Sequence, residues 1–170
     1  ISILSIADIQ FGWCAVDNRT VNPNTFLYLG AENWIHPAWT QGFYPEGVPD
    51  DWLLSYYNTQ FKSVFLPASV WQLATHDDWI NWLKDTQEDF VFVVESSNEK
   101  PPIASGRVVE ASPAWLADHV WWLDARPDMR ALAQCIAAHA VSGDPLFVIS
   151  RAGDLDRLRQ VEALREVMGY

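Results

Sequence analysis

The feature that most constrains the fold is a series of short, continuously apolar runs, each followed by a segment with helical periodicity. The runs cover residues 26–30, 63–66, 90–94, 120–123 and 146–150, and polar residues do not alternate with apolar ones in them. Strands of this kind are buried on both faces, which is typical of a parallel sheet covered by helices. The sequence therefore predicts repeated strand–helix units in an α/β fold.

Helix signals separate the predicted strands. Four helices are expected, beginning near Asp50, Thr75, Pro127 and Asp154. Thr75 and Asp78 resemble a capping box, and Asp154 is typical of an N-cap. Glycines in the left-handed C-terminal position are expected to end the last two helices, at Gly143 and Gly169. The remaining elements are expected to be a strand at 1–6, a short edge strand at 107–109 and a helical turn from Ser112.

The length of the chain limits the number of these units. A chain of 170 residues predicts a single α/β domain over residues 1–170, with a mostly parallel sheet of five or six strands. A closed eight-fold barrel typically takes about 250 residues and rarely fewer than about 200. An open or abbreviated TIM-barrel-like fold is therefore expected.

Composition argues against several classes of partner. The chain has 11 basic and 22 acidic residues, a net charge of −11, which disfavours nucleic acid. Residues 1–100 hold 13 acidic and 4 basic residues, so the acidity is concentrated in the first part of the chain. No apolar stretch approaches the roughly 18 residues of a membrane-spanning helix, so no membrane association is predicted. Cys14 and Cys135 lie far apart and no export signal is readable, which indicates a cytoplasmic protein.

Polar side chains follow the predicted strands at the ends where α/β proteins bind ligands. Glu32, Glu95 and Asp124 are the candidate catalytic carboxylates, and Arg126 and Arg151 are candidate ligand-binding groups. Such a set can bind a polyol or a sugar acid, and paired carboxylates can act as general acid and base. This hypothesis predicts that the carboxylates surround a pocket within about 10 Å of one another. The alternative is that strand ends are polar because the chain turns into solvent there.

Aromatic residues are frequent, with 10 tryptophans in the chain. Four loop or strand-end aromatics are candidate ligand-binding residues that can stack on sugar rings or contact a protein: Trp34, Trp39, Tyr44 and Trp71. The alternative for these rings is that they anchor a long loop. The tryptophans on predicted helix faces are expected to fill the core: Trp52, Trp79 and Trp82.

His36 lies in the loop after the first predicted strand and is a further candidate ligand-binding residue. With His76, Glu32 and either Asp77 or Asp78 it offers potential metal ligands. The chain has no HxH or HxxxH spacing, however, so no metal site is predicted. No nucleotide-binding glycine motif occurs, so no cofactor is predicted either.

A composite motif covers residues 30–71. It consists of Gly30-Ala-Glu-Asn-Trp34-Ile-His-Pro-Ala-Trp39, then Gly42-Phe-Tyr-Pro-Glu-Gly47, then aromatic residues on the following helix. This pattern resembles the opening of the YecE-like family (domain of unknown function 72). The resemblance implies a TIM-type barrel distantly related to sugar isomerases, and it implies no particular activity.

The departures from the family pattern bear on function. Where the family has a carboxylate and an amide after its second strand, this chain has Phe65 and Pro67. The family's basic segment after the third strand is replaced by Val93-Val94-Glu95-Ser96. These replacements predict a shortened, divergent relative that acts as a noncatalytic binding or interaction module. Its expected partner is another protein or a second copy. The alternative is an enzyme acting on a small polyhydroxy or sugar-like substrate through the strand-end carboxylates.

Overall fold

The computed structural model describes residues 25–170. The strand expected at 1–6 and Cys14 lie outside the described residues. The described part contains one parallel sheet with the strands β1 (Leu27–Glu32), β2 (Ser63–Leu66), β3 (Val91–Glu95), β4 (Val108–Ala111), β5 (Val120–Trp122) and β6 (Leu146–Ser150). The predicted α/β class is therefore confirmed.

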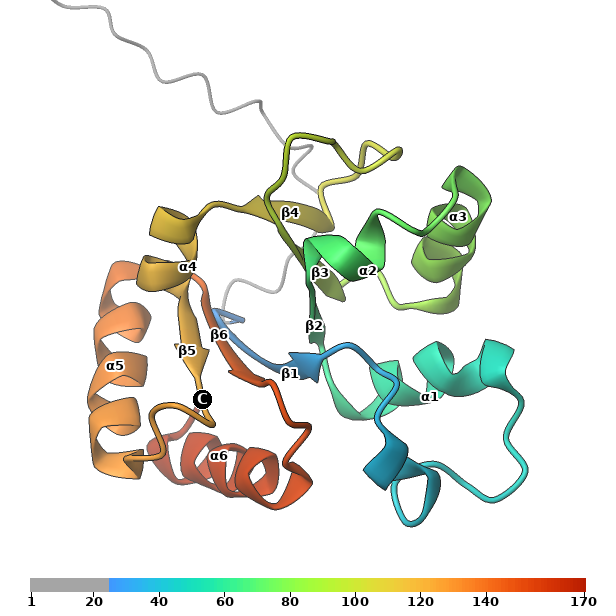
Figure 1. Cartoon of the computed structure of the whole chain (residues 1–170). Coiled ribbons are helices and arrows are strands. Elements are labelled where there is room, and N and C mark those ends of the chain that lie inside the picture. The colour runs from blue at the N-terminus through green and yellow to red at the C-terminus, as the bar shows by residue number, and fades with distance from the viewer. Residues whose placement is uncertain (1–24) are drawn as a thin grey trace, which may run out of the picture.

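The strands follow the order β4-β3-β2-β1-β6-β5. This is the circular order of a barrel, because the last strand pairs with the first. Within residues 25–170, however, β4 and β5 are edges, so the ring is open between them. Figure 1 shows the sheet curled into a half-barrel, with α4 (Pro113–His119) between the two edge strands. The expected open, TIM-barrel-like fold is confirmed.

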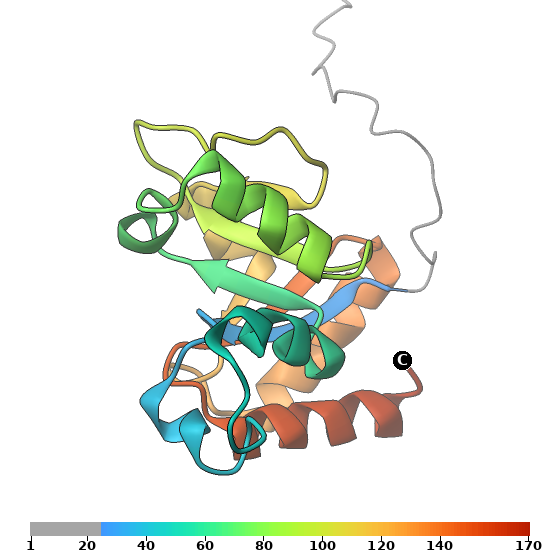
Figure 2. The same cartoon turned by 90° about the vertical axis from the view of Figure 1, so that its right-hand side faces the viewer.

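Helices cover the outer face of the sheet, and two short 3₁₀ turns precede the first of them. Their bounds are η1 (Pro37–Thr40), η2 (Asp50–Trp52), α1 (Leu53–Gln60), α2 (Ala68–Trp71), α3 (His76–Asp85), α5 (Met129–Ser142) and α6 (Leu155–Met168). In Figure 2, α1 and α3 lie side by side in front of β2 and β3.

The helix ends agree well with the local signals in the sequence. Thr75 and Asp78 form a reciprocal capping box, Asp154 caps α6, and Gly143 and Gly169 end α5 and α6 with positive φ angles. One start differs. The side chain of Asp128 accepts hydrogen bonds from the first amides of α5, so Pro127 precedes the cap and is not part of the first helical turn.

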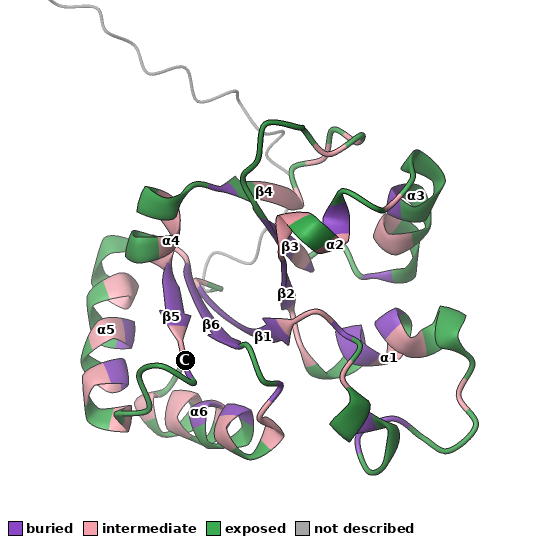
Figure 3. Ribbon diagram, viewed as in Figure 1, coloured by how far each residue is buried: buried purple, intermediate pink, exposed green. Residues whose placement is uncertain are grey.

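Three apolar clusters hold the fold together. One joins β1, β2 and β3 to α1, α2 and α3. A second joins β1, β5 and β6 to α5 and α6. The third fills the concave face of the sheet, where Trp115 and Leu116 of α4 pack against residues from all six strands. Figure 3 shows how burial concentrates on the strands and on the inward sides of the helices.

The tryptophans expected to fill the core divide into two groups. Trp79 is fully buried and Trp82 packs against the same cluster. The expectation for Trp52 is wrong, because 64% of this residue is exposed. Trp52 ends η2 before α1 begins, so it does not share the inward orientation of the α1 residues Leu54 and Tyr57.

Candidate functional site

Arg151 directly follows β6 and covers the carboxyl end of the concave face. Its guanidinium carbon lies 3.9 Å from the centroid of the Trp122 ring and 5.7 Å from that of Phe65. Its Nη1 atom donates to Glu32 Oε2 at 2.8 Å. A guanidinium group can stack on aromatic rings and pair with a carboxylate at the same time, so Arg151 acts as a lid on these two rings.

Asp124 fixes the turn between β6 and α6 from the neighbouring strand end. Its Oδ1 atom accepts a hydrogen bond from the Ser150 hydroxyl at 2.9 Å, and its Oδ2 atom accepts one from the Arg151 backbone N–H. The Ser150 hydroxyl in turn accepts a hydrogen bond from the Asp154 amide at 2.9 Å. The strand ends therefore bring Glu32, Asp124 and Arg151 together, and each takes part in an internal contact.

Glu95 belongs to a different local structure. Its Oε2 atom accepts a hydrogen bond from the Ala68 amide at 2.8 Å, at the start of α2. The Trp71 indole N–H donates to the Glu95 carbonyl at 2.9 Å. Glu95 therefore ties β3 to α2 and does not join the contacts made by Glu32 and Asp124.

Arg126 stacks on the opposite side of the sheet from Arg151. Its guanidinium carbon lies 3.8 Å above the Trp121 ring, and its carbonyl accepts the Trp121 indole N–H at 2.8 Å. Trp121 belongs to the outer cluster and Trp122 to the concave one, because successive residues of a strand point to opposite faces. The two predicted arginines therefore do not form one anion-binding pair.

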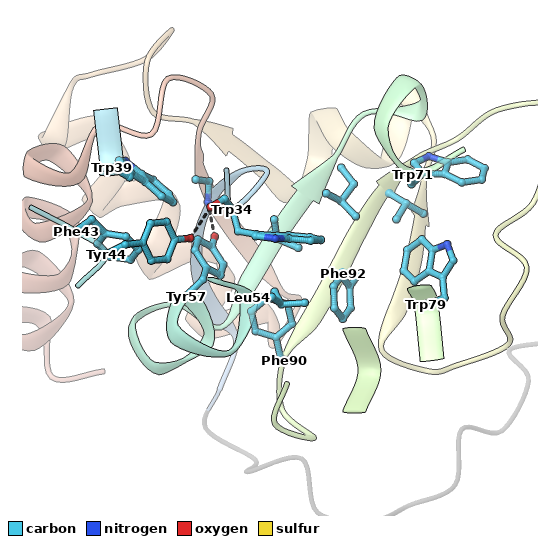
Figure 4. Close-up of a cluster of buried hydrophobic side chains, with 14 residues drawn as sticks. Trp34, Trp39, Phe43, Tyr44, Leu54, Tyr57, Trp71, Trp79, Phe90 and Phe92 are labelled. Carbon is cyan, nitrogen blue, oxygen red and sulfur yellow. Dashed lines mark hydrogen bonds between the residues drawn. The ribbon is translucent and has the colours of Figure 1, made fainter. Parts of the chain in front are cut away.

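The four candidate stacking aromatics are buried and anchor loops (Figure 4). The Trp39 indole N–H donates to the Gly153 carbonyl at 2.9 Å, which ties the β1–α1 loop to the β6–α6 turn. The Tyr44 hydroxyl donates to the Trp34 carbonyl within the same loop. Burial raises the pKa of the Tyr44 phenol well above its ordinary value, so the hydroxyl remains a donor at neutral pH. With Trp71 held against β3, these rings do not present open faces for stacking.

His36 also serves this loop. Its ring lies 4.3 Å from the Trp39 ring, centroid to centroid, and its Nε2 atom contacts the Asn33 carbonyl at 3.2 Å. His36 and Tyr44, together with Thr40 and Asp50, line a cavity of about 200 Å³ that the loop encloses. Thr40 and Asp50 were not among the sequence-predicted site residues, because only the path of the loop brings them to the cavity.

Among residues 25–170, no three His, Cys, Asp or Glu side chains are grouped so that they could hold a metal ion. None of the helices in this range is long and apolar enough to cross a membrane. The cavity described above and two further pockets, at α1–α3 and at α1–α6, are lined by residues other than Glu32, Glu95 and Asp124.

The fold and the strand-end contacts define an α/β half-barrel protein whose concave face is packed with its own side chains. Residues 28–99 match the model of the family described as "Protein of unknown function DUF72". Over this segment the chain is similar to the YecE-like family, which confirms the resemblance that the motif in residues 30–71 indicated. The match extends past the end of β3 and covers less than half of the chain. No curated protein and no solved structure matches the chain.

Proposed function

We propose that this chain is a noncatalytic binding module that contacts another protein, and that its strand-end residues close the half-barrel instead of acting on a substrate. The observation that carries this proposal is the Glu32–Arg151 ion pair stacked on Trp122. Glu32, one of the candidate catalytic carboxylates, pairs with the arginine that covers the concave core.

The other candidate acids support the same conclusion. A general acid or base must reach the substrate with a free lone pair or proton. Both carboxylate oxygens of Asp124 accept hydrogen bonds from the start of the β6–α6 turn, and Glu95 accepts one from the first residue of α2. The rings that would orient a sugar are buried. These structural contacts of the acids, together with the burial of the four rings, support a noncatalytic role for the strand-end residues.

A small polyhydroxy ligand is the second candidate function. The cavity beside His36 favours it, because Thr40 and Asp50 add polar groups to a space of about 200 Å³. In this alternative the ligand binds within the β1–α1 loop and not at the strand-end carboxylates.

Variants of the carboxylates test the proposal. Glu32→Gln and Asp124→Asn are expected to lower the melting temperature, because each removes a structural contact. A loss of about 1 kcal/mol corresponds to roughly 2–4 °C for a chain of this size. A thermal-shift screen of the wild type with xylose, ribitol and gluconate is expected to give no stabilisation.

Glu166→Gln and Asp118→Asn, at exposed positions on α6 and α4, are the matched controls and should leave the melting temperature unchanged. The proposal fails if one of the screened compounds stabilises the wild type and Glu32→Gln abolishes that effect without lowering the melting temperature. Stabilisation that persists in both carboxylate variants would instead favour the cavity beside His36.

A further inference from the structure

Among residues 25–170, Trp52 is the one tryptophan that the fold leaves exposed to solvent. It is 64% exposed at the end of η2, whereas Trp34, Trp39, Trp71 and Trp79 are buried. Exposed apolar residues are common singly, but tryptophan is the residue most enriched at the energetic centres of protein interfaces. What surrounds Trp52 therefore decides whether its exposure has a function.

Trp52 lines an open groove of about 490 Å³ between α1 and the end of α3. Val48 and Tyr56 provide further apolar surface, and Tyr56 lies one helical turn beyond Trp52. The Ser55 hydroxyl donates to the Asp85 carbonyl at 3.2 Å, so the two sides of the groove are tied together. In Figure 2 the two helices that form it lie side by side.

The charged groups that line this groove are acidic. Asp51 is next to Trp52 in η2, and Asp85 ends α3 on the other side. The basic residues closest in sequence are Lys84, exposed on α3, and Lys62, which contacts Gln87 and Asp89; neither lines the groove. The whole segment from residue 25 to residue 100 contains 11 acidic and 3 basic residues. The charged residues that line the groove and the net charge of this segment are therefore negative.

An exposed indole in a groove that is also lined by two carboxylates is complementary to an organic cation. Ammonium and guanidinium groups are attracted to the face of a tryptophan ring, and charge-assisted hydrogen bonds to carboxylates add to that attraction. Apolar surface on the same wall favours a ligand that carries a hydrocarbon group beside its cation.

We infer that this groove binds a segment of a partner protein that presents a Lys or Arg side chain next to an aliphatic or aromatic one. The cation lies over Trp52 between Asp51 and Asp85, and the apolar side chain packs on Val48 and Tyr56. This inference rests on the proposed binding function and specifies its site and the chemistry of its partner.

Selection from a phage library of random heptapeptides, with the full chain as bait, tests the inference. The enriched peptides are expected to carry Lys or Arg beside Leu, Ile, Phe or Trp. The strongest of them is then synthesised with a fluorescein label, and its affinity is measured by fluorescence anisotropy. Trp52→Ala is expected to weaken binding at least tenfold. The double variant Asp51→Asn/Asp85→Asn is expected to weaken it severalfold and to reduce its salt dependence.

Two control variants distinguish peptide binding in the groove from general electrostatic attraction of basic peptides to an acidic protein. Leu73→Ala removes an apolar residue that is 84% exposed outside the groove, and Glu166→Gln removes an exposed charge from α6. Both should leave peptide affinity unchanged. Thermal unfolding of Trp52→Ala should match the wild type, because the ring contributes little to the core.

The outcomes distinguish this inference from the proposed function. Basic peptides that bind Trp52→Ala as tightly as the wild type would overturn the inference and leave a binding function at another surface. A selection that enriches no peptides, or only acidic or neutral ones, would also overturn it. The proposed function itself fails only on the sugar-dependent result described for Glu32→Gln.

Discussion

The Tyr57 side chain connects two strands of the sheet, a role that no local sequence signal indicates. The residue is fully buried, and its hydroxyl accepts a hydrogen bond from the Ala31 amide at 2.8 Å and donates one to the Ser63 carbonyl at 2.7 Å. It therefore links β1 to β2 at the base of the β1–α1 loop. The same two strands approach so closely that a Cβ atom on Gly30 would lie 2.0 Å from the Ser63 carbonyl oxygen.

Tyr57→Phe is expected to lower the free energy of unfolding by at least about 2 kcal/mol. The change leaves a buried N–H and a buried C=O without their partner, and each such group costs roughly 1–3 kcal/mol. Urea denaturation monitored by circular dichroism measures the loss. Tyr56→Phe is the control, since Tyr56 is only partly buried and lines open grooves. Equal losses in the two variants would contradict this role for the Tyr57 hydroxyl.

The same residue predicts alkaline sensitivity. Burial raises the pKa of Tyr57 far above the usual phenol value; the hydrogen bond from the Ala31 amide lowers it in part, and Tyr44 raises it slightly further. In the unfolded chain a tyrosine ionises near pH 10. The folded state therefore keeps Tyr57 protonated at pH values where the unfolded chain would lose the proton. The contribution of the protonated Tyr57 to the free energy of unfolding is fully present below about pH 10, and it is lost as pH rises towards the folded-state pKa. Unfolding free energies measured between pH 8 and about pH 11.5 should fall steeply above pH 10, and more steeply in the wild type than in Tyr57→Phe. Parallel curves would contradict the prediction.

At the scale of elements, the parts of the fold that local sequence determines were predictable. β2 and β6 coincide with apolar runs, and α3, α5 and α6 begin or end at residues whose side chains or φ angles cap a helix. The position of Trp52 was not predictable in this way. Helical periodicity predicts which face a residue occupies only when that residue belongs to the helix. Trp52 belongs to the 3₁₀ turn η2 that precedes α1, so the period of α1 does not apply to it.

Asp154→Ala provides a test of capping at this scale. The Asp154 side chain accepts a hydrogen bond from the Arg157 amide at 3.1 Å, and α6 packs on β1 and β6. Loss of this N-cap is expected to lower the free energy of unfolding by about 1 kcal/mol. Asp156→Ala, two residues further along in the first turn of α6 and more exposed, should have a smaller effect. Chemical denaturation of both variants measures the difference, and a larger loss for Asp156→Ala would contradict the assignment.

For the whole molecule, the order of the strands explains which predicted site residues meet. Glu32, Asp124 and Arg151 converge because β1, β6 and β5 are consecutive in the sheet. Glu95 is the last residue of β3, which lies two strands from β1 in the other direction, and it contacts α2 instead. Apolar runs alone do not reveal that the last strand pairs with the first, nor which face each strand residue occupies. For this reason the sequence did not predict that Arg151 stacks on Phe65 and Trp122.

Arg151 is expected to stabilise the whole half-barrel because it closes the concave core. Arg151→Ala removes a stacked cation and an ion pair, with an expected loss of about 1–3 kcal/mol of unfolding free energy. Arg151→Lys keeps the charge but not the planar group, so its loss should be intermediate. Urea denaturation checks the ranking, and an Arg151→Ala variant as stable as the wild type would show that the concave core needs no lid.

The central place of β1 also has a consequence for synthesis on the ribosome. β1 pairs with β2 soon after both leave the exit tunnel, but its other partner, β6, is translated more than a hundred residues later. Until then the nascent chain exposes one side of its innermost strand as an unpaired edge, which is open to wrong pairing. Pairing between such distant segments is also slow, because a long loop must close first. Completion of the sheet must therefore wait until β6 has emerged.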